Sequence, residues 1–209
     1  MKENLRSREG KSKPDADSFF KKITGRLKLL TVLFSAVFSA CAVFATTRHE
    51  RVSIQVSVSG QTLRLFKDGR ILHEYPVSTS KYGVGSEAGS DKTPLGKHRI
   101  ARKIGRGAPL LAIFKSRVDT KKTAELNLSD HPSKEDFVTT RILWLEGLEP
   151  GLNRGGSVDS FARFIYIHAT QDEGLIGRPA SHGCIRMKNA DVKELFDLVG
   201  VATPVEILP

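Results

Sequence analysis

Residues 181–187 read Ser181-His182-Gly183-Cys184-Ile185-Arg186-Met187. A helical pattern begins at Asn189, five residues after the cysteine, so the Cys184 thiol is predicted to lie in a strand-to-helix loop. A thiol is a weak nucleophile until a nearby imidazole or oriented backbone amides favour its thiolate form. We therefore interpret this stretch as the chemical centre of the chain.

Two histidines are candidates for the base that would activate the thiol. His182 lies two residues before Cys184, and in an extended segment the two side chains point the same way. His168 ends the apolar run 164–167, which offers the rigid mounting that a catalytic base needs. Spacing does not choose between them. Two other readings stay open here: a buried thiol with capping histidines, and a metal site of His168, His182 and Cys184.

Gly183 is the residue that would let a substrate approach the backbone beside the thiol, because it has no side chain. The backbone amides of Gly183 and Cys184 could then stabilise the negative oxygen of a tetrahedral intermediate. The stretch therefore has the parts of an acyl-transfer site.

The N-terminus indicates export. Residues 1–28 form a basic tail with nine Lys or Arg residues against four acidic ones, and residues 29–47 are uncharged and rich in Leu, Val, Phe and Ala. This order is typical of a signal peptide or an uncleaved transmembrane anchor. We expect a protein of the bacterial periplasm or cell envelope. The second cysteine, Cys41, falls in this segment, which would leave Cys184 unpaired where exported thiols usually pair.

Residues 50–209 have the length of one domain. They carry only about half of the net charge of +10, so the overall pI of 9.8 overstates how basic the folded part is. No basic stripe interleaved with aromatic residues is present, which argues against nucleic-acid binding. A mildly basic surface instead suits an anionic polymer.

The apolar pattern of this domain is mainly that of β-strands. Alternation predicts a strand from Val52, and Lys67-Asp68-Gly69-Arg70 predicts a hairpin turn between two further strands. A helix is expected from Asn189 as N-cap to its end at Gly200. The predicted strands cover residues 52–58, 62–66, 71–77, 97–101, 137–145, 163–168 and 201–208. We expect a mainly β fold, a β-sandwich or mixed sheet with one principal helix after the cysteine.

Residues 103–136 read as one long polar loop that contains Gly105, Gly107, Pro109 and Pro132. Loops of this length in a compact domain are more often functional than idle. We interpret the segment as a candidate lid over the site.

Taken together, these residues resemble the L,D-transpeptidases with the YkuD-type catalytic domain. The signature of that family is a His, a loop, then Ser or Thr, His, Gly and Cys, followed by an aliphatic residue and Arg or Asn. Here it stands as His168 followed by residues 181–186, and the similarity extends to residues 75–80 and 93–96. The resemblance thus covers nearly all of residues 50–209.

The resemblance assigns roles to single residues. It implies that Cys184 is the nucleophile and His168 the general base, with the Ala169 carbonyl orienting the imidazole. His182 and Ser181 would be structural or line the substrate pocket. Arg186 would hold the carboxylate or backbone of the substrate through its planar guanidinium, the alternative being a salt bridge to a loop.

The resemblance also implies a reaction and its partners. Peptidoglycan stem peptides would be the substrate, joined by 3→3 cross-links without a metal or organic cofactor, and carbapenems would acylate the thiol. An L,D-carboxypeptidase, an enzyme that attaches proteins to the wall, and an inactive wall-binding module are the alternatives. If residues 29–47 are not cleaved, the membrane would be a further partner.

Overall fold

The computed structural model describes residues 51–209. The predictions for the tail 1–28, the apolar segment 29–47 and Cys41 lie outside the described residues. Within the described part, no helix is both long enough and apolar enough to cross a membrane.

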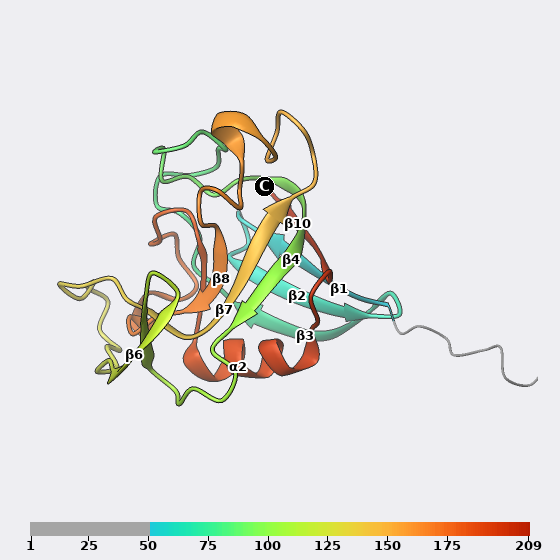
Figure 1. Cartoon of the computed structure of the whole chain (residues 1–209). Helices are drawn as coiled ribbons and strands as arrows, with labels where there is room; N and C mark the ends of the chain where they lie inside the picture. Colours follow the sequence, from blue (N-terminus) through green and yellow to red (C-terminus); the bar gives the residue numbers. More distant parts are fainter. Residues whose placement is uncertain (1–50) are drawn as a thin grey trace, which may run out of the picture. The chain divides into compact units, whose positions relative to one another are not determined.

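In residues 51–209, ten strands form one mixed sheet with a single α-helix packed against it, which confirms the predicted fold class (Figure 1). The loops of this described part contain two short 3-10 turns, η2 (Gly156–Val158) and η3 (Glu173–Leu175). The strands are β1 (Val52–Ser57), β2 (Thr62–Lys67), β3 (Arg70–Pro76), β4 (Gly96–Ile104), β5 (Ala112–Lys115), β6 (Val118–Thr123), β7 (Val138–Gly147), β8 (Tyr166–Ala169), β9 (Ile185–Met187) and β10 (Pro204–Leu208), and the helix is α2 (Asn189–Leu198).

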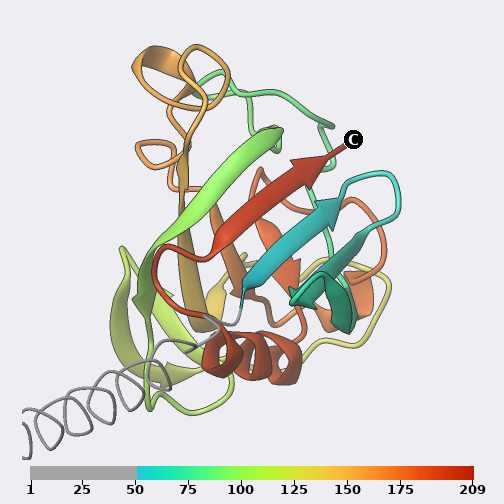
Figure 2. The same cartoon turned by 90° about the vertical axis from the view of Figure 1, so that its right-hand side faces the viewer.

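The strand order is β3-β2-β1-β10-β4-β7-β5-β6, and β8 pairs with both β7 and β9. Strand β10 runs parallel to β1 and antiparallel to β4, so the latest strand of the sequence lies inside the sheet (Figure 2). The β2–β3 hairpin is confirmed: Asp68 and Gly69 both have positive φ angles, 50° and 79°, as its tight turn requires.

The sheet separates two apolar clusters. The larger cluster contains α2, which contacts β7 and β8, and it includes Ile167 and Ala169. The smaller one lies on the other face and includes Trp144 and Tyr166, with Cys184 packed against it. Because side chains alternate along a strand, His168 lies on the same face of β8 as Tyr166. This alternation brings the histidine to the face that carries the thiol.

Three sequence predictions are wrong. Residues 103–136 are not one loop, because they contain the end of β4 and the β5–β6 hairpin, and β5 pairs with β7. Asn189 is not the N-cap: Lys188 takes that position, and the Asn189 carboxamide points into the protein to bind the Thr139 and Thr140 hydroxyls. Cys184 does not lie in a strand-to-helix loop either, because the short strand β9 stands between it and α2. The helix ends at Leu198 with Val199 as its C-cap, so Gly200 directly follows the cap, as predicted.

Candidate active site

Strands β8 and β9 bring the predicted site residues together. They pair in parallel with His168 opposite Arg186 and Ala169 opposite Met187. Parallel partners point to the same face, so the imidazole and the guanidinium lie side by side while Ala169 and Met187 enter the larger apolar cluster. Cys184 directly precedes β9 and has a free thiol.

The Cys184 thiol is half-buried and makes two backbone contacts. Its sulfur accepts a hydrogen bond from the Tyr166 N–H at 3.4 Å, and the S–H donates to the Phe164 carbonyl at 3.4 Å. Burial raises the pKa of the thiol to about 11, although the Tyr166 N–H and the Arg186 charge act in the opposite direction. At neutral pH the resting sulfur is therefore protonated.

His168 is buried, with 3% of its surface exposed. Its Nδ1 lies 2.7 Å from the Ala169 carbonyl oxygen, a contact that requires the proton to be on Nδ1 and leaves Nε2 with a free lone pair. Burial, and then the charge of Arg186, lower the pKa of the imidazole well below its usual range. The ring is thus neutral and able to accept a proton at neutral pH.

The loop before the thiol is held by its own polar groups. The Ser181 hydroxyl donates to the Cys184 carbonyl at 2.6 Å and accepts from the Gly183 N–H at 3.2 Å, while the Thr93 hydroxyl donates to the Gly183 carbonyl at 3.0 Å. Gly183 has a φ of +114°, and a Cβ there would lie 3.2 Å from the Lys92 carbonyl oxygen. Only glycine suits this position.

The same contacts bear on the predicted oxyanion site. One of the two amides expected there, the Gly183 N–H, is engaged by Ser181, so its role stays a prediction that requires this bond to open. The Tyr166 N–H, by contrast, already points at the sulfur. Sequence analysis missed this amide because backbone direction leaves no trace in residue type.

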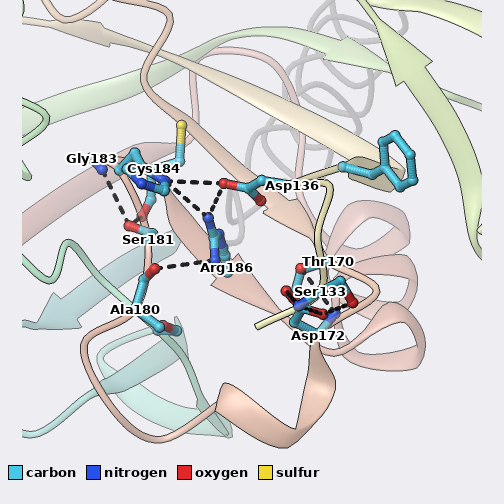
Figure 3. A network of polar contacts seen from close by, with 12 residues as sticks. Ser133, Asp136, Thr170, Asp172, Ala180, Ser181, Gly183, Cys184 and Arg186 are labelled. Atoms are coloured by element: carbon cyan, nitrogen blue, oxygen red, sulfur yellow. Dashed lines mark hydrogen bonds and ion pairs between the residues drawn. The ribbon is translucent and has the colours of Figure 1, made fainter. Parts of the chain in front are cut away.

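Arg186 is engaged by a loop residue that the sequence did not single out. Its guanidinium contacts the Asp136 carboxylate and donates to the Ala180 carbonyl at 3.3 Å (Figure 3). The Asp136 carboxylate also lies 3.1 Å from Nδ1 of His182. The Arg186 side chain is 5% exposed and that of Asp136 is 42% exposed, so the carboxylate covers the solvent side of the guanidinium. The structure thus has the salt bridge that was the alternative for Arg186.

Asp136 arrives on a loop that is hydrogen-bonded near the site. The buried Asp172 carboxylate accepts from the Asn127 side chain at 2.9 Å and from the Ser133 N–H at 3.1 Å (Figure 3). The Phe137 N–H donates to the Gln171 side chain at 3.1 Å. The last part of the predicted lid, residues 124–136, and the following Phe137 are therefore hydrogen-bonded to the segment that follows β8.

The alternative metal site is not formed by this geometry. Within residues 51–209, no group of three or more His, Cys, Asp or Glu side chains is arranged to hold a metal ion. The thiol and the imidazole instead lie on one face of the β8–β9 pair, with the Ala169 carbonyl fixing the imidazole, which suits nucleophilic attack with proton transfer.

Comparison with known proteins gives a family match over almost the whole described domain. The family model YkuD, described as the L,D-transpeptidase catalytic domain, matches residues 51–207. A putative L,D-transpeptidase YkuD of Bacillus licheniformis is 29% identical over 157 residues, which cover 75% of this chain and 65% of the relative.

Shorter and more distant similarities were also found. The probable L,D-transpeptidase ErfK/SrfK of Salmonella typhimurium is 48% identical over 46 residues, 22% of this chain and 15% of that protein. An L,D-transpeptidase structure from Mycobacterium smegmatis aligns with a TM-score of 0.46 at 19% identity, covering 77% of this chain and 59% of that one. The chain spans less than two thirds of the length of each of these proteins.

Proposed function

Because the chain belongs to the YkuD family of L,D-transpeptidase catalytic domains, we propose that it is a peptidoglycan L,D-transpeptidase with Cys184 as its nucleophile. The observation that carries this proposal is a free thiol on the same face of the β8–β9 pair as a buried, neutral histidine whose Nδ1 is fixed by a carbonyl. The stem-peptide substrate and the reaction are inferred from family membership and from this chemistry.

In the first step, Nε2 of His168 accepts the thiol proton as the sulfur attacks the carbonyl carbon of the third residue of a donor stem tetrapeptide. The C–N bond to the terminal D-amino acid then breaks, and its amine leaves with the proton from His168. A thioester on Cys184 remains. The Tyr166 N–H, 3.4 Å from the sulfur, stabilises the negative charge that develops on the sulfur during this step.

In the second step, an acceptor amine attacks the thioester carbon and the C–S bond breaks. The amine proton passes through His168 to the departing thiolate, which restores the resting enzyme. A diamino-acid side chain as acceptor gives the 3→3 cross-link. Water as acceptor would make the protein an L,D-carboxypeptidase, and a protein amine would make it a wall-attachment enzyme.

A role for Arg186 in binding the donor carboxylate is part of this proposal. Since Asp136 covers the guanidinium in the free protein, a donor carboxylate would have to replace that carboxylate. We further propose that residues 29–47 direct the protein out of the cytoplasm and, if retained, tether it to the membrane.

The test is to incubate the full-length protein with a carbapenem and to measure its intact mass, with Cys184→Ala as the matched control. The expected result is one covalent adduct on the native protein and none on the variant. A folded native protein that stays unmodified would contradict the assignment of the nucleophile and favour an inactive wall-binding module.

Purified disaccharide tetrapeptide then identifies the acceptor. Cross-linked dimer that has lost one terminal residue is expected, whereas tripeptide monomer alone would indicate hydrolysis. In this assay His168→Gln should slow acylation by about 10²-fold or more, because it removes the base.

A further inference from the structure

A pocket on the thiol face of the sheet is lined by positively charged side chains. It has a volume of about 520 Å³ and lies between the end of β4, the loop that follows it and the β5–β6 hairpin. Its apolar floor is made by Ile104, Ala112 and Phe114. These residues belong to, or pack against, the apolar cluster that contains Tyr166 and contacts Cys184. The pocket thus lies over the apolar cluster against which Cys184 also packs.

The wall of this pocket carries more positive than negative charge. Arg106, Arg117, Lys121 and Lys122 line it, and its one carboxylate, Asp119, is paired with Lys121 at 2.9 Å. Within residues 51–209, neither Arg106 nor Lys122 forms an ion pair. A concave wall with uncompensated cations raises the local concentration of anions.

A buried arginine holds the loop that forms one wall of the pocket. Arg141 is 4% exposed, and its Nη1 donates to the carbonyl of Ala108, a pocket residue, at 2.7 Å. Its Nε is buried without a hydrogen-bond partner, and no carboxylate of the described residues forms a salt bridge with it. Its guanidinium carbon lies 5.5 Å from the ring centre of Phe196 on α2, so Arg141 supports the pocket wall only through the Ala108 carbonyl.

Arg117 connects the pocket to the site of reaction. Its guanidinium carbon lies 5.0 Å from the Trp144 ring centre and 4.8 Å from that of Phe164, and its Nη1 donates to the Tyr166 hydroxyl at 3.4 Å. Phe164 and Tyr166 are the two residues whose backbones hold the Cys184 sulfur. A ligand anion at Arg117 would therefore lie beside the residues that position the thiol.

We propose that this basic pocket, defined by Arg106, Arg117 and Lys122, binds the carboxylates of the acceptor stem peptide. The inference rests on the proposed transpeptidase function, which needs a second peptide beside the thioester. The pocket that contains His182 and Arg163, about 280 Å³ in volume, shares no lining residue with the basic pocket. Two separate pockets, one lined by Arg117 next to Phe164 and Tyr166 and the other by His182, match a reaction with two peptide substrates.

The test measures acceptor binding without catalysis, in the full-length Cys184→Ala protein. The probe is a tripeptide-stem muropeptide, which lacks the bond that the thiolate would attack. Its dissociation constant is compared between this protein and one that also carries Arg106→Gln and Lys122→Gln. We expect about a fivefold weakening, because two cations that face the anion are lost, and a smaller difference at high salt.

The matched control carries Arg70→Gln and Lys193→Gln, which remove the same charge from β3 and α2. It should bind the probe as tightly as the parent protein. The proposal would be overturned if the pocket variant bound the probe as tightly as the parent protein, or if the control lost as much affinity as the pocket variant. It would also be overturned if a probe with amidated carboxylates bound as tightly as the probe itself. Tighter, pocket-dependent binding of glycerol phosphate would overturn it as well and would assign the site to a phosphate polymer.

This outcome is separable from that of the proposed function. Acylation by a carbapenem depends on Cys184 and His168. When Arg106→Gln and Lys122→Gln are introduced into the protein that retains Cys184, acylation should proceed within about twofold of the native rate. A missing adduct would therefore refute the nucleophile, whereas unchanged muropeptide binding would refute the pocket.

Discussion

At Cys184 the protein combines a protonated sulfur with a base that is already neutral. Burial disfavours both the thiolate and the imidazolium, so the ion pair does not form at rest. In the proposed mechanism, the thiol proton then moves to His168 while the sulfur attacks. This arrangement favours reaction with an acyl donor held in place over reaction with any small electrophile.

The buried imidazole makes stability depend on pH. The pKa of His168 in the folded protein lies below the value of about 6.5 in an unfolded chain, so the unfolded state binds more protons between these two values. The free energy of unfolding should fall on acidification from pH 7 to pH 5, by up to about 2 kcal/mol from this group. Urea unfolding at both pH values checks this: His168→Gln should lose less stability than the native protein, and an equal loss would contradict it.

Asp136 is expected to tune the thiol through Arg186. In Asp136→Asn the Arg186 charge is no longer balanced, and the carboxylate that raises the pKa of Cys184 is gone. The pH midpoint for alkylation of Cys184 by iodoacetamide should therefore shift downward. Asp130→Asn, in the same loop but paired with His131 at the surface, is the control and should leave the midpoint unchanged. The same midpoint in both variants would mean that Asp136 is merely structural.

At the residue level, the sequence was informative where chemistry restricts residue type. Cys184, His168 and Gly183 could be singled out because a thiol, an imidazole and a missing side chain have few substitutes. Asp136 could not, since it is one acid in a polar loop and its partner Arg186 is 50 positions away. The assigned roles themselves await the experiments described above.

Among the elements, the strands with one buried face were predictable and the β5–β6 hairpin was not. Its turn is made by Ser116 and Arg117, which have φ angles of 48° and 70° without the usual Asn or Gly. Strand β6 is also largely polar, so no alternation marks it. The same turn, which has no recognisable turn sequence, directs Arg117 toward Trp144.

The start of α2 depends on one buried side chain. Asn189 accepts from the Thr139 and Thr140 hydroxyls and donates to the Thr170 carbonyl at 2.8 Å, and thereby joins the helix to β7 and the end of β8. Asn189→Ala should lower the free energy of unfolding by about 2–4 kcal/mol, because these buried groups lose their partner. Lys193→Ala, on the exposed side of the same helix, should cost about 0.5 kcal/mol or less. Chemical denaturation of both variants tests this prediction, and similar losses of unfolding free energy in the two variants would refute it.

For the whole molecule, β10 is the strand that unites the sheet. It lies between β1 and β4 and buries Val205 and Ile207. A chain that ends before Pro204 should not fold, since two inner strands would lose their backbone partners. Removal of Pro209 alone, which accepts one hydrogen bond from Ser59, should be tolerated. Near-UV circular dichroism and thermal melting distinguish the two truncated proteins. A cooperative unfolding transition in the protein that ends before Pro204 would disprove the prediction.

The position of β10 also sets when folding can finish. Ribosomes make β1 to β3 first and β10 after every other strand, yet the sheet cannot close between β1 and β4 until β10 is present. While synthesis proceeds, the domain stays an open chain with two unpaired edges. If residues 29–47 direct export as we propose, a secretion channel that accepts only unfolded polypeptide would receive this domain before its sheet has closed.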